Sequence, residues 1–358
     1  MSPTNEHTTV DGVSIDPSSI DQRAKIDPAS MPLSVLDLAI VAKGTTSAQA
    51  LGEATEMVKV ADRLGYRRFW VAEHHNMSSV ASTNPPVLMA HLAAHSERIR
   101  VGSGGVMLPN HAPLVVAEQF ALLEALNPGR IDLGIGRAPG TDRNTAAALR
   151  RSVQGLDEDF PRHLLDVMGL LGDERVEEGL FKHFRATPVA TSAPVVWLLG
   201  SSGFSAQLAG VLGLPFAFAN HFDMGGTEQA AQIYLDHFEP SVVLDAPHLM
   251  VSATVVVGAT PEEADYLAAP SKLRRFALRT GQPVELVGPD EAMAHPNFAT
   301  ATSMPSNSLV GTAETVVEGL RQLRARTAAD ELMLYPVAHA LEHRVASLEG
   351  IAAQWSTT

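Results

Sequence analysis

The sequence predicts an α/β fold, a (β/α)8 barrel of the TIM type with insertions, over residues 31–358. Three observations lead to this prediction. From Met31 onward, short apolar runs alternate with amphipathic segments. The apolar runs lack polar alternation, which is typical of strands that are buried on both faces of a parallel sheet. Eight such strand–helix units follow one another, and eight repeats of this unit are best closed as a barrel. An open, doubly wound sheet is the alternative.

The predicted strands are short and apolar. They cover Val35–Val41, Phe69–Ala72, Ile99–Gly102, Ile131–Ile135, Val195–Leu199, Pro215–Ala219, Met250–Val257 and Glu331–Tyr335. The first predicted helix carries apolar residues from Leu51 to Leu64 on one face, and Gly65 ends it. Further helices are predicted at Val87–Ala94, Leu114–Leu126, Ser205–Leu212 and Thr227–Phe238, after Pro261, and at the end as far as Ala353.

Three stretches do not fit the minimal repeat. Residues 143–191 are polar and are predicted to be mostly helical. The stretch Ala269–Leu309 contains five prolines, and we expect a long irregular excursion of the kind that covers active sites. Residues 1–30 are polar, rich in Ser, Thr and Asp, and are predicted to form a flexible N-terminal tail.

Composition argues against several classes of partner. The formal net charge of −14 does not suit a nucleic-acid-binding protein, which needs concentrated Lys and Arg. No window is long and apolar enough to suggest a membrane partner. The chain has no cysteine, which removes disulfides, thiolate catalysis and thiolate metal sites. These features fit a cytoplasmic protein.

Chemistry-bearing residues gather where the predicted strands end. The second strand runs directly into Glu73, His74 and His75. In a parallel barrel the carboxyl ends of the strands form one mouth, where active sites are built. Histidine is also the side chain whose ordinary pKa allows proton exchange near neutrality.

The run Gly200-Ser201-Ser202-Gly203 lies between a predicted strand and a helix. Free backbone N–H groups and two hydroxyls at a helix N-terminus indicate a phosphate site, although an N-cap with a tight turn is the plainer explanation. Arg137 could supply a second phosphate partner, or a surface ion pair. Gly104 and Gly105 follow the third strand, where glycine often permits a flat ligand to approach the backbone. Together these features suggest a flavin nucleotide.

With these motifs in view, residues Leu33 to Ala353 resemble the bacterial luciferase-like family of flavin-dependent monooxygenases. The resemblance is carried by Ala72-Glu73-His74-His75, Val101–Pro109, Pro128–Arg137, Leu199–Ser202 and Gly213–Ala219. The pattern is most similar to that of the single-chain, non-luminescent branch. Light-emitting members carry a reactive cysteine where this chain has Gly136, so light emission is not expected.

The resemblance implies a role for each matched residue. His74 corresponds to the catalytic histidine near the flavin ring, with Glu73 and His75 as its supporting neighbours. Gly104 and Gly105 correspond to small residues under the ring, joined by a non-proline cis peptide. The positions around the FMN phosphate correspond to Arg137, Ser201, Ser202 and Ser205, and we include Gly203 of the same loop.

The expected activity is monooxygenation of a small, mostly apolar organic substrate, using O2 and reduced FMN from a separate flavin reductase. The alternatives are a deazaflavin-dependent dehydrogenase of the same fold and a non-catalytic flavin-binding protein. A homodimer is expected from the resemblance alone. No metal is predicted. His339 and His343 have the spacing of a metal-binding pair on one helix, but with no third ligand nearby we interpret them as part of a solvent-exposed helix face. Whether Asn110-His111 and Asn220-His221 line the mouth is left open.

Overall fold

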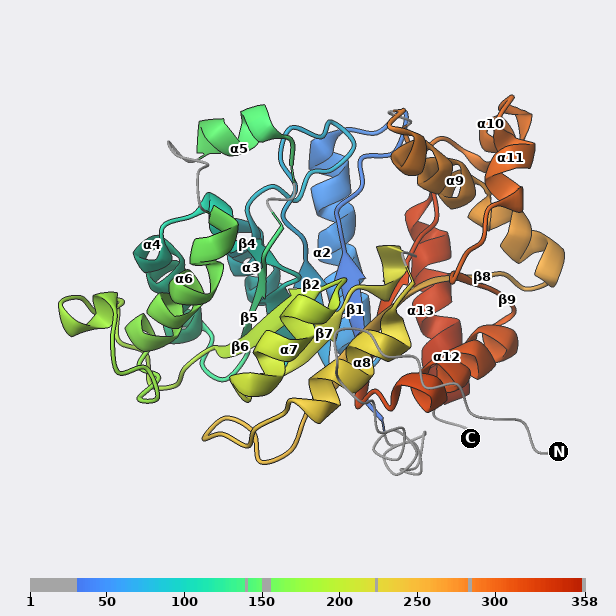
Figure 1. The fold of residues 1–358 in the computed structure, drawn as a ribbon. Helices are drawn as coiled ribbons and strands as arrows, with labels where there is room; N and C mark the ends of the chain where they lie inside the picture. The colour runs from blue at the N-terminus through green and yellow to red at the C-terminus, as the bar shows by residue number, and fades with distance from the viewer. Residues whose placement is uncertain (1–30, 139–140, 150–155, 223–224, 283–284, 356–358) are drawn as a thin grey trace, which may run out of the picture.

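The structure is a computed structural model, and it describes residues 31–138, 141–149, 156–222, 225–282 and 285–355. The predicted tail, residues 1–30, lies outside the described residues. Figure 1 shows strands at the centre of the molecule with helices around them.

In the described part of the chain, eight parallel strands form a closed barrel. They are β1 (Leu33–Asp37), β2 (Arg68–Val71), β3 (Arg100–Ser103), β5 (Ile131–Gly136), β6 (Val195–Gly200), β7 (Phe216–Phe218), β8 (Leu249–Val257) and β10 (Glu331–Pro336). Strand β10 closes the barrel, because Leu334 pairs with Val35 of β1 on one side and with Ala253 of β8 on the other. The predicted (β/α)8 barrel is therefore confirmed, and the open sheet is excluded.

Two short strands extend the sheet: β4 (Val106–Met107) pairs with β5, and β9 (Leu309–Gly311) pairs with β8. The helices are α2 (Ser47–Arg63), α3 (Pro85–Ala94), α4 (Pro113–Leu126), α5 (Arg143–Leu149), α6 (Leu156–Leu170), α7 (Gly203–Val211), α8 (Thr227–Asp236), α9 (Pro261–Thr280), α10 (Pro289–Ala294), α11 (Phe298–Ser303), α12 (Ala313–Thr327) and α13 (Leu341–Trp355). The 3-10 turns are η2 (Leu108–Asn110), η3 (Leu180–Lys182) and η4 (Asn220–Phe222).

Local sequence explains where elements begin and end. Helix α2 begins with a capping box, in which Thr46 and Gln49 satisfy each other's backbone N–H groups. Strand β1 stops at Asp37, short of the predicted Val41. The carboxylate of Asp37 accepts the backbone N–H of Ala39 at 2.6 Å, and Ala39 has a φ of 47°. This turn directs the chain out of the sheet.

The expectation of an irregular excursion over Ala269–Leu309 is wrong for much of its length. Helix α9 continues through Pro270 to Thr280, and α10 and α11 follow beside it (Figure 1). The reason is a set of apolar residues at helical spacing, which form a separate small core: Ala269, Leu273, Phe276, Val287, Ala292, Phe298 and Ala301. Asn307 reaches Asn220 after β7, so the stretch lies on the carboxyl-terminal side of the barrel.

A buried ionic network fills the opposite end of the barrel, where the strands begin. Arg68 lies between Asp132 and Glu331, 2.9 Å from each, and its guanidinium stacks 4.7 Å from the ring centroid of Trp197. Trp70 donates to Asp132 at 3.1 Å. Each carboxylate has a cationic or hydrogen-bonding partner, which offsets the cost of burying its charge. The network therefore occupies the amino-terminal end of the barrel, away from the predicted site.

Candidate active site

A pocket opens at the carboxyl-terminal mouth of the barrel. Most of its walls are apolar, and the residues that line them include Leu36, Leu38, Trp70, Ala72, Met107, Leu199, Ala217, Phe218, Phe222, Met250 and Met333. The polar lining comes from His74, Arg137, Ser201, Ser202, Ser205, His221 and Ser252. The pocket thus combines an apolar interior with a few polar groups, as small-molecule sites do.

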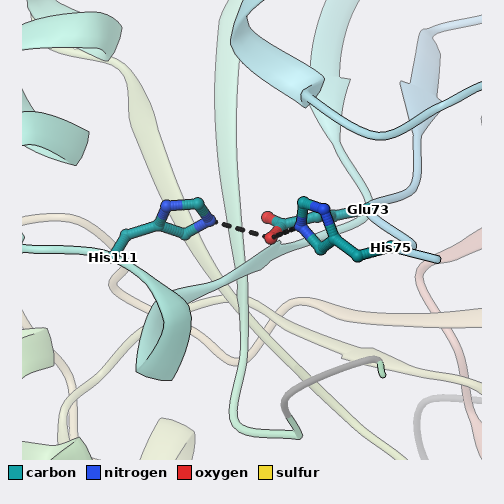
Figure 2. A group of neighbouring side chains, drawn as sticks. All are labelled: Glu73, His75 and His111. Carbon is teal, nitrogen blue, oxygen red and sulfur yellow. Dashed lines mark hydrogen bonds and ion pairs between the residues drawn. The ribbon is translucent and has the colours of Figure 1, made fainter. Parts of the chain in front are cut away.

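The three predicted residues after β2 separate into two groups. His74 lines the pocket, whereas Glu73 and His75 are absent from its lining. Glu73 is fully buried, and Figure 2 shows the imidazoles of His75 and His111 converging on its carboxylate. His74 alone of the three therefore meets a ligand in this pocket directly.

Glu73 is the centre of a hydrogen-bonded cluster. Its Oε1 lies 2.8 Å from Nε2 of His75 and 2.8 Å from Nε2 of His111, and its Oε2 accepts the backbone N–H of Met107 at 2.9 Å. Burial alone would raise the pKa of Glu73. The hydrogen bonds and charge of His111, with the Met107 N–H and His75, outweigh it and lower the pKa. The carboxylate therefore stays ionised and ties the end of β2 to β4.

The three ligand-type atoms of Glu73, His75 and His111 lie within 4.8 Å of one another, so the set could hold a metal ion. The hydrogen bonds to Glu73 already account for the orientation of all three side chains. Neither imidazole has a partner at Nδ1 among the described residues of the kind that orients metal-bound histidine. We therefore interpret the cluster as a support for β4.

The peptide bond between Gly104 and Gly105 is cis, as predicted. Both glycines line the pocket; a side chain at Gly105 would require the backbone to shift, and one at Gly104 would fit only tightly. A Cβ on Gly105 would lie 2.8 Å from the carbonyl oxygen of Gly134, and one on Gly104 would lie 3.1 Å from Cδ1 of Leu36. This segment is a bare backbone surface in the pocket wall, and Glu73 holds it in place through the adjoining Met107.

The predicted phosphate loop joins β6 to α7. Ser201, Ser202 and Ser205 line the pocket, whereas Gly203 is the first residue of α7 and is absent from the lining. Ser202 is the N-cap residue but makes no side-chain capping bond, so its hydroxyl is available beside the first N–H groups of the helix.

Arg137 joins this loop from the end of β5. Its guanidinium lies 4.5 Å from the ring centroid of Phe204 on α7. The structure thus brings the predicted phosphate-binding residues together at one side of the pocket. A cation, three hydroxyls and a helix N-terminus form a donor set that fits a phosphate group.

Several pocket features were not predicted from the sequence. Met107 lines the pocket, and its sulfur would lie 3.0 Å from a Cβ added at Gly136. Its thioether therefore fills the space that a side chain at Gly136 would need. Ser252 enters from the middle of β8, where no turn or helix end marks it. Neither Asn110 nor His111 lines the pocket; His111 contributes to the Glu73 cluster, and Asn110 is buried beside it.

His339 and His343 do not share a helix face. His339 precedes α13, which begins at Leu341, and His343 lies 3.8 Å from the carboxylate of Glu342. The helical pairing assumed for them is therefore wrong, because the chain turns between β10 and α13.

None of the helices in the described part of the chain combines the length and the apolar composition that crossing a membrane requires.

The fold and the position of this pocket are typical of (β/α)8-barrel enzymes, whose active sites lie at the carboxyl ends of the strands. The family of luciferase-like monooxygenases matches residues 31–331, so the chain belongs to that family. It is therefore an oxidoreductase of a flavin-dependent family, as the resemblance predicted.

Known relatives agree with this membership. The chain is 43% identical to the Bacillus subtilis protein YvbT over 327 residues, which cover 90% of this chain and 96% of YvbT. It is 40% identical to a luciferase-like monooxygenase of Escherichia coli K12, covering 85% and 91% of the two chains. The crystal structure of apo-MsnO8 superposes with a TM-score of 0.82 at 34% identity, covering 92% and 99%.

Proposed function

We propose that the protein is an FMN-dependent monooxygenase, which uses reduced FMN and O2 to oxidise a small, mostly apolar organic substrate. The observation that carries the proposal is the composition of one pocket. A bare glycine segment, a phosphate-type donor set and a histidine all line the same apolar cavity. This combination matches a ligand with a flat ring at one end and a phosphate at the other.

Each group has a role in this proposal. Gly104 and Gly105 would let the flavin ring approach the backbone, and Ser201, Ser202, Ser205 and Arg137 would hold the phosphate. Gly203 would contribute as the first residue of α7, through its backbone. The bound flavin would supply the electrons that activate oxygen.

His74 is the group that we propose as the acid/base at the ring or substrate. Its place in an apolar pocket lets it hold or move a proton where water is largely excluded. Glu73 and His75 would act from behind the wall, because they hold β4 and the glycine segment rather than facing the ligand. They are positioning residues in this account, with no direct part in the chemistry.

Relatives support the flavin and a separate reductase without fixing the substrate. One relative at 32% identity is named an N-acetyl-S-alkylcysteine monooxygenase of Bacillus subtilis. Another, at 25%, is the oxygenase component of a trigonelline monooxygenase from Acinetobacter baylyi, a name that implies a second component. We propose the same arrangement here, with a flavin reductase as the donor of reduced FMN. A homodimer stays a prediction.

Proteins of this fold differ in their cofactor, which is why the deazaflavin alternative is tested separately. An F420-dependent secondary alcohol dehydrogenase shares the fold at a TM-score of 0.63 and 16% identity. At that identity the likeness extends to the fold alone. Competition between the two cofactors distinguishes the hypotheses, because FMN ends in the phosphate that the serine loop fits.

The proposal is tested by measuring oxygen uptake with a flavin reductase and a panel of small apolar substrates. Substrate-dependent uptake with an oxygenated product would support it. Stoichiometric FMN binding with no product from any substrate would favour a non-catalytic flavin-binding protein. Turnover only with deazaflavin would favour a dehydrogenase.

A further inference from the structure

A second histidine faces the same pocket from the opposite strands. His221 lies in the turn η4 after β7 and lines the cavity together with His74. Its ring packs against Phe222 and Tyr335, with centroids 4.3 Å and 5.7 Å away. The proposed flavin site does not use this side chain.

Ser252 on β8 fixes both the backbone and the ring of His221. Its Oγ accepts the backbone N–H of His221 at 3.2 Å and lies 2.7 Å from the ring Nδ1. The same hydroxyl donates to the carbonyl of Phe218 at 3.2 Å. Asn220 strengthens the connection by donating to the backbone carbonyl of Ser252 at 3.1 Å.

The hydrogen bond from Ser252 to the carbonyl of Phe218 favours one tautomer of the ring. A serine hydroxyl has one proton, and the carbonyl of Phe218 can only accept a hydrogen bond. Once that proton is used, the short contact to Ser252 requires a proton on Nδ1 of His221. The other nitrogen, Nε2, then carries a lone pair, and it has no partner among the described residues.

The ring also stays neutral. Burial disfavours the imidazolium form, and the neighbouring His74 opposes a second positive charge, so the pKa of His221 falls to about 4. Among the described residues that line this pocket, none is an Asp or Glu that could offset either effect. His221 therefore differs from His74 in role: it offers a fixed acceptor instead of a mobile proton.

We propose that His221, set by Ser252, is the residue that recognises the substrate, with Nε2 accepting a hydrogen bond from a hydroxyl or N–H group. The substrate would then be an apolar molecule with one hydrogen-bond donor beside the site of oxidation. This inference rests on the proposed function and narrows its substrate class. Ser252 is a positioning residue in it, because it acts through the ring of His221.

The tautomer can be measured without flavin or substrate. Nitrogen-15 NMR of the full chain with labelled histidine, assigned with His221→Phe, should show Nδ1 protonated and Nε2 bare near neutral pH. Ser252→Ala should abolish this pattern by freeing Nδ1. A proton on Nε2 in the wild type would overturn the inference.

Substrate recognition is tested with two probes of similar shape, cyclohexanol, which can donate a hydrogen bond, and cyclohexanone, which can only accept one. Dissociation constants are measured by ligand-observed NMR, with and without FMN. One hydrogen bond corresponds to a factor of about five in affinity. The preference for the alcohol over the ketone should therefore fall about fivefold in His221→Phe, and further in Ser252→Ala, where Nε2 can carry the proton.

FMN affinity serves as the control and should change less than about twofold in either variant, because neither side chain belongs to the phosphate loop. An unchanged alcohol-to-ketone ratio in both variants would overturn the proposed role of His221. Failure of the wild type to bind FMN would instead overturn the proposed function, and the probe ratios would still test His221.

Discussion

Replacing Ser202 by aspartate should separate the phosphate end of the proposed FMN site from the ring end. Ser202 is the exposed N-cap of α7, and its hydroxyl makes no capping bond within the protein. Aspartate is itself a good N-cap and suits the positive end of a helix, so the fold should keep its stability. The new carboxylate would, however, stand where the phosphate binds.

The size of the effect follows from Coulomb's law. Two unit charges about 4 Å apart repel by about 1 kcal/mol in water and about 4 kcal/mol near a protein surface. A phosphate carries about 1.5 to 2 negative charges. Because the loop is solvent-exposed, we take the lower part of this range, about 2–4 kcal/mol in all. FMN binding should therefore weaken roughly 30- to 1,000-fold in Ser202→Asp.

The assay is a fluorescence titration of FMN and of riboflavin, which lacks the phosphate, against the wild type and two variants. Ser202→Asn matches aspartate in size without the charge, and it should weaken FMN less than about tenfold. Riboflavin affinity should change only a few-fold in both variants. Equal losses for FMN and riboflavin in Ser202→Asp would refute the assignment of the phosphate to this loop.

Three further predictions concern the histidines, Glu73 and the barrel base. His74→Ala should slow single-turnover oxidation roughly 100- to 10,000-fold while FMN affinity stays near wild type. His75→Ala should have a much smaller effect, because its ring contacts Glu73 behind the wall; the opposite order would exchange their roles. Glu73→Gln places an amide N–H2 group against either the two imidazoles or the backbone N–H of Met107. Urea unfolding should therefore show a loss of about 1–3 kcal/mol in the free energy of unfolding; unchanged stability would argue against the cluster. At the amino-terminal end of the barrel, burial alone would raise the pKa of Glu331. The charge of Arg68 and the hydrogen bonds from His248 and Ser34 outweigh burial and lower this pKa to about 2. Ionised Glu331 should contribute about 3 kcal/mol to the free energy of unfolding; this contribution is complete above the unfolded pKa of 4.5 and disappears as pH falls toward 2. The free energy of unfolding should therefore depend less steeply on pH below 4.5 in Glu331→Gln, and an equally steep dependence would contradict this assignment.

The barrel was predictable because its strands are continuous apolar runs, and because parallel strands bring all their carboxyl ends to one mouth. This rule predicted that four residues from separate strand ends would lie around one pocket, and all four line it: His74, Gly104, Arg137 and Ser202. The helices within Ala269–Leu309 were not predicted, because five prolines usually indicate irregular chain. Here Pro270 lies inside α9 and Pro289 begins α10, and apolar residues of these helices pack into a small core of their own.

Other parts of the site depend on contacts between residues distant in sequence. Glu73 reaches the backbone of Met107, and Ser252 reaches His221, only after the strands are paired. A serine in the middle of a buried strand carries no local signal of such a role. The sequence could therefore indicate where the site lies, but not which side chains act from behind its wall.

The central claim is that this pocket binds reduced FMN for reaction with oxygen. It is tested most directly by anaerobic titration of the wild type with reduced FMN and, in parallel, with reduced deazaflavin, followed by mixing with oxygen in a stopped-flow spectrometer. The account predicts stoichiometric FMN binding, at least about tenfold tighter than deazaflavin binding, and oxidation of the bound flavin on mixing. Preferential deazaflavin binding, or bound FMN that oxygen does not oxidise, would contradict it.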